Sequence, residues 1–222
     1  MDVTETDKIK PSVEQAESFF GRIDVLVNNA GYGLLGAVEE TTHEQTVRQF
    51  NVNVFGLLNL TRAVLPIMRK QHSGFIINMS SIAGIGAAPG FGMYNASKFA
   101  VEGLSEALAQ EVGVFGIKVM IVEPGPFRTE FAGRSGELSE EMEIYKSTAG
   151  NARRYIENVN GKQVGDPHLG ALAIIKAVEA PTPPLRLPLG KMAYGRLDAK
   201  IKSLTKDYED WKEVAQATDF AE

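Results

Sequence analysis

The chain of 222 residues contains no cysteine, a single tryptophan and three histidines. Without cysteine it can form no disulfide, no thiolate metal site and no cysteine nucleophile. The histidines, His43, His72 and His168, are scattered along the sequence, so we expect no metal site. The absence of cysteine is compatible with a reducing compartment, and we expect a cytoplasmic location.

The sequence also lacks an excess of basic residues. It has 23 Lys and Arg against 28 Asp and Glu, a formal net charge of -5. A nucleic acid partner is therefore not expected, because phosphate binding calls for a dominant basic surface. No uninterrupted apolar run approaches about 18 residues, and residues 1–11 are too polar for a signal peptide, so we expect neither a membrane span nor a leader. The length predicts one domain over residues 1–222.

Three short apolar runs that end in small or polar residues predict buried strands. They cover residues 23–30, 75–79 and 118–122. Apolar residues at helical spacing fill the intervening segments 43–70 and 94–114. The alternation of strand and helix predicts an α/β fold with parallel strands, and ligands of such sheets bind beyond the carboxyl ends of the strands.

The second half of the chain is less regular. Residues 127–160 are predicted to form a flexible lid or substrate region with a charged helix near 138–158, although a solvated surface helix explains that charge equally well. Helix 167–179 and strand 185–189 follow, and Pro188 suits only an edge or an end of a sheet. In the helical tail 193–214, apolar residues recur at helical spacing, which we interpret as core packing or a subunit contact.

Tyr94 and Lys98 are four residues apart, so that both side chains lie on one face of the predicted helix. A free tyrosine has a pKa of about 10, and a neighbouring ammonium favours the phenolate. Ser81 follows the strand at 75–79 and offers a hydroxyl donor at the same edge of the sheet. Together these groups suit carbonyl reduction, with Tyr94 as acid/base and Ser81 stabilising the charge that develops on oxygen. Alone, the pair could equally be a surface cation beside an aromatic ring.

Gly31, Gly33 and Gly36 spell the G-x-G-x-x-G pattern of dinucleotide-binding turns. That pattern requires a helix that opens at its last glycine and an acidic residue at the end of the next strand. Here residues 39–42 come before any helical periodicity, so we reject this interpretation.

Five motifs occur in a fixed order: Asn28-Asn29-Ala30-Gly31, Asn53-Val54-Phe55-Gly56, Ser81, Tyr94-x-x-x-Lys98, and Pro124-Gly125 followed by Thr129. In order and spacing the chain resembles the short-chain dehydrogenase/reductase family. The resemblance implies a Rossmann-like, doubly wound parallel sheet and an oxidoreductase. It also implies hydride transfer between NAD or NADP and a ketone or secondary alcohol; the choice between the two cofactors stays open.

The same resemblance implies a role for individual residues. Tyr94 would be the catalytic acid/base, Lys98 would lower its pKa and hold the nicotinamide ribose, Ser81 would position the substrate, and Asn53 would support a proton relay. Without the family, Asn53 would simply be an amide that bonds a nearby carbonyl. Besides Tyr94 and Lys98, the resemblance implies cofactor contacts by Asp2, Val3, Asn29, Ala30, Gly31, Pro124, Gly125 and Thr129.

In one respect the chain departs from the family pattern. In the family, a glycine-rich phosphate-binding turn precedes the segment that Asp2 and Val3 resemble. Two strands, two helices and most of a third strand carry that turn, and this sequence does not contain them. We therefore interpret the chain as an N-terminally truncated version of the fold, with weakened cofactor binding and an unpaired apolar edge at strand 23–30. It is then either an ordinary enzyme whose sequence begins late or a catalytically inactive binding or interaction module.

The substrate and the oligomeric state are predicted less specifically. The apolar loop 82–93, together with Phe127 and Phe131, suggests a lipophilic carbonyl or alcohol as the small-molecule substrate. Helices 43–70 and 94–114 resemble those that pair across two-fold interfaces in the family, so we expect a homodimer or homotetramer.

Overall fold

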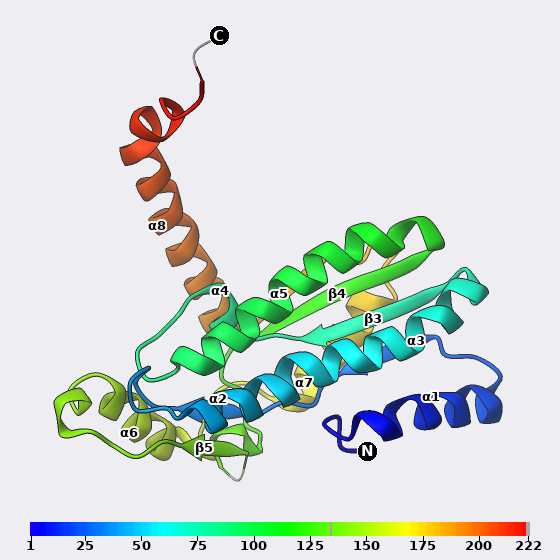
Figure 1. The fold of residues 1–222 in the computed structure, drawn as a ribbon, viewed down its shortest axis with the longest axis horizontal. Helices are drawn as coiled ribbons and strands as arrows, with labels where there is room; N and C mark the ends of the chain where they lie inside the picture. Colours follow the sequence, from blue (N-terminus) through cyan, green and yellow to red (C-terminus); the bar gives the residue numbers. More distant parts are fainter. Residues whose placement is uncertain (134, 221–222) are drawn as a thin grey trace.

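Four parallel strands form the central sheet of the computed structural model, which describes residues 1–133 and 135–220 (Figure 1). The sheet has the order β1-β3-β4-β6. These strands are β1 (Val25–Asn28), β3 (Gly74–Met79), β4 (Ile117–Pro124) and β6 (Arg186–Leu189). The α/β fold with a parallel sheet, expected from the sequence, is therefore confirmed. Pro188 lies on β6, which pairs only with β4, so the residue without an N–H group occupies an edge strand as expected.

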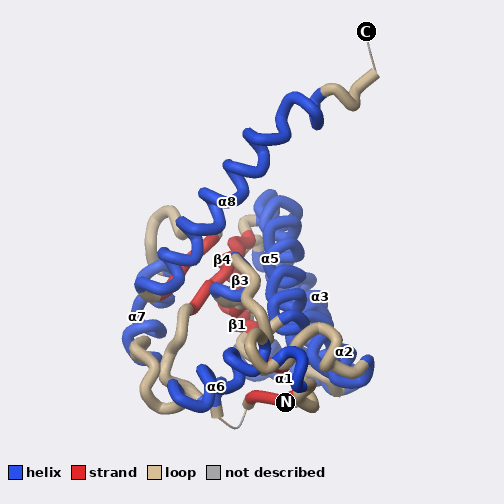
Figure 2. Tube along the Cα trace, turned by 90° about the vertical axis from the view of Figure 1, so that its left-hand side faces the viewer, coloured by secondary structure: helices blue, strands red, loops and turns tan. Residues whose placement is uncertain are grey.

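Helices cover the two faces of this sheet unequally (Figures 1 and 2). One face packs on α1 (Thr6–Phe20), α3 (Leu57–Gln71) and α5 (Gly92–Val112), with Val64, Met68 and Ile76 in the core between them. The other face packs on α7 (Pro167–Val178), where Phe75 and Met120 meet the helix. Successive residues of β3 therefore enter different cores, which explains why the strands are apolar throughout rather than alternating.

The edge strand β1 is only partly covered. Leu26 is buried in the core beneath α1 and α3, whereas Val25 and Val27 point to the opposite face and are 44% and 50% exposed. These two valines lie in register with Phe75 and Ile77, which α7 covers. An apolar surface along β1, expected from the sequence, is thus present among the described residues.

Residues 43–71 form one continuous helical stretch rather than a uniform α-helix. It consists of α2 (His43–Phe50), a π-helical segment η1 (Asn51–Gly56) and α3. A capping box between Thr42 and Gln45 fixes its start, and His72 ends it in the left-handed conformation. By length and mean hydropathy this stretch could cross a membrane, but buried core helices pass the same test. Its Thr61, Val64 and Met68 lie against the sheet.

The predicted lid, residues 127–160, is only partly α-helical, so the helix expected near 138–158 is present in the second half of that range and absent from the first. It contains two short 3-10 turns, η3 (Glu130–Ala132) and η4 (Glu143–Tyr145), and the strand β5 (Gly136–Leu138). Only α6 (Ala149–Val159) is an α-helix. The strand β5 pairs in parallel with β2 (Gly33–Leu35), and this pairing competes successfully with helix formation. Residue 134, within the predicted lid, lies outside the described residues.

The C-terminal tail is helical as expected, but it does not pack into the core. Helix α8 (Lys191–Gln216) projects away from the rest of the protein (Figures 1 and 2). Ala193 is its only buried residue, and every residue from 205 to 216 is exposed. Core packing as an interpretation of the apolar spacing in 193–214 was therefore wrong for this chain on its own.

Candidate active site

Ser81 stands directly beyond the carboxyl end of β3. Its backbone is extended, and its Oγ accepts a hydrogen bond of 3.1 Å from the backbone N–H of Ala83, which caps the short helix α4 (Ile82–Ile85). The turn fixes the serine at the polar edge of the sheet, because the side chain serves as the N-cap of the helix that follows. The hydroxyl also lies close enough to the phenol of Tyr94 to act on its pKa, which it lowers.

Tyr94 and Lys98 lie on the face of α5 that is turned towards the sheet. Both are buried, at 7% and 6% exposure. The Nζ of Lys98 donates a 2.7 Å hydrogen bond to the carbonyl oxygen of Met79 and lies 5.8 Å from the centre of the Tyr94 ring. The structure therefore brings together the hydroxyl, phenol and ammonium groups that the sequence singled out.

Burial dominates the protonation of this pair. It raises the pKa of Tyr94 to about 12, against the smaller opposing effect of the Ser81 hydrogen bond. It lowers the pKa of Lys98 to about 8, while the charge of Glu102 acts in the opposite direction. In this geometry the Lys98 ammonium is bonded to a backbone carbonyl and burial has the larger effect on the phenol, so the lowering of the Tyr94 pKa by Lys98 stays a prediction.

Asn53 lies in the π-helical segment, a form of helix often found at functional sites. Its Oδ1 accepts from the backbone N–H of Tyr32, and its Nδ2 donates to the Tyr32 carbonyl and to Ser97 Oγ, at 3.0, 3.0 and 3.1 Å. Asn53 therefore joins the loop after β1 to the helix that carries Tyr94. This is the ordinary amide bonding weighed from the sequence, and it does not exclude a further role in proton relay.

An aromatic ring covers the phenol. Phe131, in η3, lies 5.2 Å from Tyr94 between ring centres, and it also presses on Gly33, where a Cβ would come within 2.7 Å of the Phe131 ring. Thr129 caps η3 by accepting from the N–H of Phe131 at 3.4 Å, so the predicted cofactor contact stands at the base of this cover. Phe127, predicted beside Phe131, packs instead on Gly165 and Gly170.

Of the other predicted cofactor residues, only Gly31 adjoins the catalytic group. A Cβ on Gly31 would lie 3.2 Å from Asn53 Oδ1 and 3.6 Å from Lys98 Nζ, so the backbone passes close to both. Asn29 and Ala30, just before it, are exposed at the end of β1. The exposed backbone at Gly31 beside an ammonium with two further N–H donors fits the ribose and amide groups of a nicotinamide cofactor.

The remaining predicted contacts are more distant or differently engaged. The carboxylate of Asp2 accepts hydrogen bonds from Thr4, and Val3 packs on Gly56 in the π-helical segment. At the end of β4, Pro124 pairs with Leu189, and Gly125 donates to the Leu189 carbonyl at 2.9 Å. The structure also supports the rejection of the G-x-G-x-x-G pattern as a dinucleotide-binding turn. Residues 33–35 form the strand β2, and the next helix begins only at His43.

Sequence reasoning missed a carboxylate cluster behind Lys98. Glu102 is one helical turn after Lys98 on α5, and Glu123 lies on β4; both are buried and both bond to Arg186 of β6. Glu102 Oε1 and Glu123 Oε2 are buried and have no hydrogen-bonding partner among the described residues. Burial, followed by the charge of Glu102, raises the pKa of Glu123 to about 7, because two adjoining carboxylates resist simultaneous ionisation. The i, i+4 spacing of Lys98 and Glu102 was the available sequence signal.

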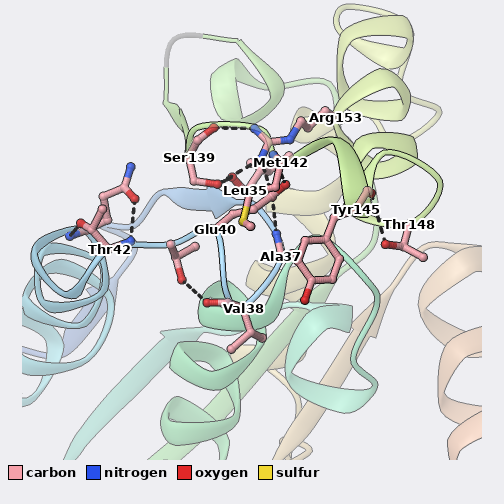
Figure 3. A network of polar contacts seen from close by, with 12 residues as sticks. Leu35, Ala37, Val38, Glu40, Thr42, Ser139, Met142, Tyr145, Thr148 and Arg153 are labelled. Carbon is pink, nitrogen blue, oxygen red and sulfur yellow. Dashed lines mark hydrogen bonds and ion pairs between the residues drawn. The ribbon is translucent and has the colours of Figure 1, made fainter.

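A second missed feature anchors the lid (Figure 3). The buried Arg153 of α6 donates to Glu40 Oε2 at 2.6 Å and to the Ser139 carbonyl at 2.6 Å. Glu40 also accepts from the backbone N–H groups of Ala37 and Met142, at 2.7 and 2.9 Å. This Glu40–Arg153 latch holds the segment after β5 against the loop after β2. The residues are 113 apart in the chain, so no local pattern indicates their contact.

Two hollows of the surface lie beside Tyr94 and Lys98 rather than over them. One of about 370 Å³ is lined by Gly31, Tyr32 and Glu137 among others, and one of about 520 Å³ by Val38, Pro89 and Phe99 among others. Neither is lined by Ser81, Tyr94 or Lys98. Phe131 lies against the Tyr94 ring, 5.2 Å away between ring centres, and so narrows the approach to the phenol.

Comparison with known proteins identifies the family. The model of the family described as short chain dehydrogenase matches residues 1–139. The 3-ketodihydrosphingosine reductase of Bacteroides thetaiotaomicron is 45% identical over 93% of this chain and 77% of its own length. A crystal structure of a short-chain dehydrogenase from Streptomyces avermitilis superposes with a TM-score of 0.94 and 42% identity, over 99% of this chain and 80% of that one.

A more distant structure carries a cofactor. The gluconate 5-dehydrogenase of Burkholderia cenocepacia, in complex with NADP and tartrate, superposes with a TM-score of 0.58 and 30% identity, over 60% of this chain and 52% of that one. These matches leave the predicted N-terminal truncation as a prediction, and they confirm the Rossmann-like fold and the resemblance inferred from the motifs. The chain belongs to the short-chain dehydrogenase family of oxidoreductases.

Proposed function

We propose that the protein transfers a hydride between a nicotinamide cofactor, NAD or NADP, and a ketone or secondary alcohol. The observation that carries this proposal is the convergence of Ser81, Tyr94 and Lys98 at the carboxyl end of β3, with Tyr94 and Lys98 buried. Membership of an oxidoreductase family supports the reaction class.

In the reducing direction, the Tyr94 phenol gives its proton to the carbonyl oxygen as the carbonyl carbon receives the hydride. In the oxidising direction, the phenolate takes the hydroxyl proton. The Ser81 hydroxyl donates to the same oxygen, and this bond strengthens as negative charge develops there. Lys98 assists when its ammonium turns from the Met79 carbonyl towards the phenol, because a nearby positive charge lowers the pKa of tyrosine.

The residues around Gly31 support the assignment of the cofactor. Tyr94 and Lys98 would hold the nicotinamide ribose, Gly31 would allow its close approach, and Thr129 would contact the carboxamide side. Asp2 and Val3 would border the adenine end, while Asn29, Ala30, Pro124 and Gly125 would line the path between. The cofactor, when bound, supplies or accepts the hydride; the NADP in the gluconate dehydrogenase supports this choice of group without deciding between NAD and NADP.

A lipophilic substrate fits the covering residues best. Phe131 lies on the phenol, and the neighbouring loop 82–93 is rich in Ile, Ala, Gly and Met. The reductase from Bacteroides is named for a substrate that carries a keto group, which supports a ketone. The prediction that Phe127 lines this pocket was wrong, because Phe127 packs beneath α7.

We retain two further expectations as proposals. The protein is a cytoplasmic homodimer or homotetramer that pairs through the helical stretch 43–71 and α5. Phe55 and Phe99, which are 49% and 41% exposed on these helices, support such a contact.

The function is tested by following nicotinamide absorbance with a panel of aliphatic and aromatic ketones and both reduced cofactors. Tyr94→Phe removes the proton donor and is expected to abolish turnover while the protein still unfolds at the wild-type urea midpoint. Tyr145→Phe is the matched control, since that phenol bonds only to Glu39 at the surface. The proposal would be refuted if Tyr94→Phe were as active as the wild type. A wild-type protein that binds the cofactor but never reduces a ketone would favour the catalytically inactive interaction module.

A further inference from the structure

Helix α8 carries a continuous apolar stripe that the described residues leave largely uncovered. Its members recur alternately at three and four residues: Tyr194, Leu197, Ile201, Leu204, Tyr208, Trp211 and Ala215. This is the a and d spacing of a coiled coil, sustained over about three heptads. Ile201, Tyr208 and Trp211 are 53%, 70% and 64% exposed. The stripe is therefore presented to solvent on a helix that projects from the body (Figure 1).

Only the first turns of α8 are held by the rest of the chain. Arg196 donates to the Ala87 carbonyl at 3.2 Å and packs on Gly86 of the loop after α4. Beyond Leu204 every helical residue is exposed. A helical segment of about 12 residues without tertiary packing is marginal in water. This part of α8 therefore needs a partner for its stripe.

The charges beside the stripe indicate what that partner is. Residues 191–216 contain six basic and five acidic side chains, so the helix lacks the predominantly basic polar face of membrane-binding helices. In the heptad, Asp207 occupies a g position, and Asp198 and Lys212 occupy e positions. In a parallel pair of identical helices Lys212 faces Asp207 of the other copy, and in an antiparallel pair it faces Asp198. The charges that flank the stripe therefore suit pairing with a second copy of the same helix.

We propose that α8 pairs with α8 of a second copy of this chain through the stripe, as a short two-helix coiled coil. The charged residues on the side of α8 opposite the stripe are consistent with this pairing. Lys206 and Asp210 form an ion pair along the same helix on the side away from the stripe, where they remain in water. This contact is separate from the helices 43–71 and 92–112 and does not depend on the proposed oxidoreductase activity.

The single tryptophan makes the pairing directly measurable, because Trp211 stands on the stripe and no other indole contributes to the fluorescence. In the full chain, pairing shields Trp211, so its emission shifts to shorter wavelength and acrylamide quenches it less than in a diluted sample. Leu204→Asp places a charge on the stripe and is expected to abolish both effects. Ser203→Asp adds the same charge at an outward position and should leave both unchanged, with far-ultraviolet circular dichroism confirming the fold of each variant.

A charge reversal tests the register. Lys212→Asp should weaken the pairing, seen as a lower mass in light scattering or greater quenching of Trp211. Adding Asp207→Lys restores a parallel pair, and adding Asp198→Lys restores an antiparallel one. The proposal is overturned if Trp211 is equally quenched in the wild type and in Leu204→Asp at the highest attainable concentration. It is also overturned if shielding occurs only when phosphatidylcholine–phosphatidylglycerol vesicles are added.

Discussion

The Glu40–Arg153 latch gives a sharp prediction about the lid. Removing one member of a buried ion pair costs about 3–5 kcal/mol, because the other charge stays buried without its partner. In Arg153→Met, Glu40 keeps two backbone donors, at 2.7 and 2.9 Å from Ala37 and Met142, so we expect about 3 kcal/mol, the lower end. The free energy of unfolding is measured by urea titration, with hydrogen exchange of residues 139–153 locating the loss.

A double-mutant cycle separates the pair from its surroundings. Glu40→Gln with Arg153→Met should cost about 1–3 kcal/mol less than the sum of the single changes, because their interaction is counted twice in that sum. Arg154→Met is the matched control; that side chain is exposed, and its loss should change stability by less than about 0.5 kcal/mol. Equal effects of Arg153→Met and Arg154→Met, or a coupling near zero, would refute the reasoning.

Acid provides an independent test of the same carboxylate. Burial by itself raises the pKa of Glu40, but the hydrogen bonds from Met142, Ala37 and Arg153 outweigh it and leave the pKa below the ordinary 4.5. A carboxylate with a lowered pKa in the folded state contributes stability above its unfolded value, and this contribution is lost as the pH falls through the folded value. We therefore expect the wild type to lose stability below about pH 4.5 more steeply than Glu40→Gln; parallel curves would contradict this.

Three further outcomes follow from the site. Phe131→Ala should lower KM for bulky ketones by roughly 2–10-fold, because the aromatic contact with Tyr94 that closes the site is worth about 0.5–1.5 kcal/mol; an unchanged KM would show that the ring does not obstruct entry. Burial raises the pKa of Glu123 to about 7, so the folded protein keeps this proton up to about pH 7, whereas the unfolded chain loses it near pH 4.5. The free energy of unfolding should therefore fall as the pH rises from about 4.5 to 7 in the wild type, and Glu123→Gln should lack this fall. Asn53→Ala should cost about 1–3 kcal/mol in urea, since it strands the buried partners of three hydrogen bonds; a loss within error would refute its structural role.

Local patterns were sufficient to predict the strands and the proximity of Ser81, Tyr94 and Lys98. The runs that became β1, β3 and β4 are apolar because both faces of the sheet are covered, and this property is visible in the sequence. Tyr94 and Lys98 are one helical turn apart, so a correctly predicted helix over this segment places their side chains on the same face. Ser81 could be added because parallel strands present their carboxyl ends at one edge.

Long-range contacts explain where sequence reasoning failed. The segment 138–148 has a charged composition that favours a helix, but β5 pairs with β2, and the Glu40–Arg153 latch fixes the turn that follows. Asn53, in the π-helical segment, bonds to Tyr32 and Ser97, which lie 21 and 44 residues away, so no local pattern indicates these contacts. The exposure of α8 likewise follows from the arrangement of the whole fold, because its spacing alone suits core and partner contacts equally.

The most direct test of the central claim is isotopic transfer at the reacting carbon. The protein is incubated with a ketone that it turns over and with reduced cofactor deuterated at the transferring position of the nicotinamide. We expect one deuterium at the carbinol carbon of the alcohol formed by the wild type and by Tyr145→Phe, and none with Tyr94→Phe. Deuterium transfer that persists at the wild-type rate in Tyr94→Phe, or a folded wild-type protein that transfers none from either NADH or NADPH to any ketone, would contradict the account.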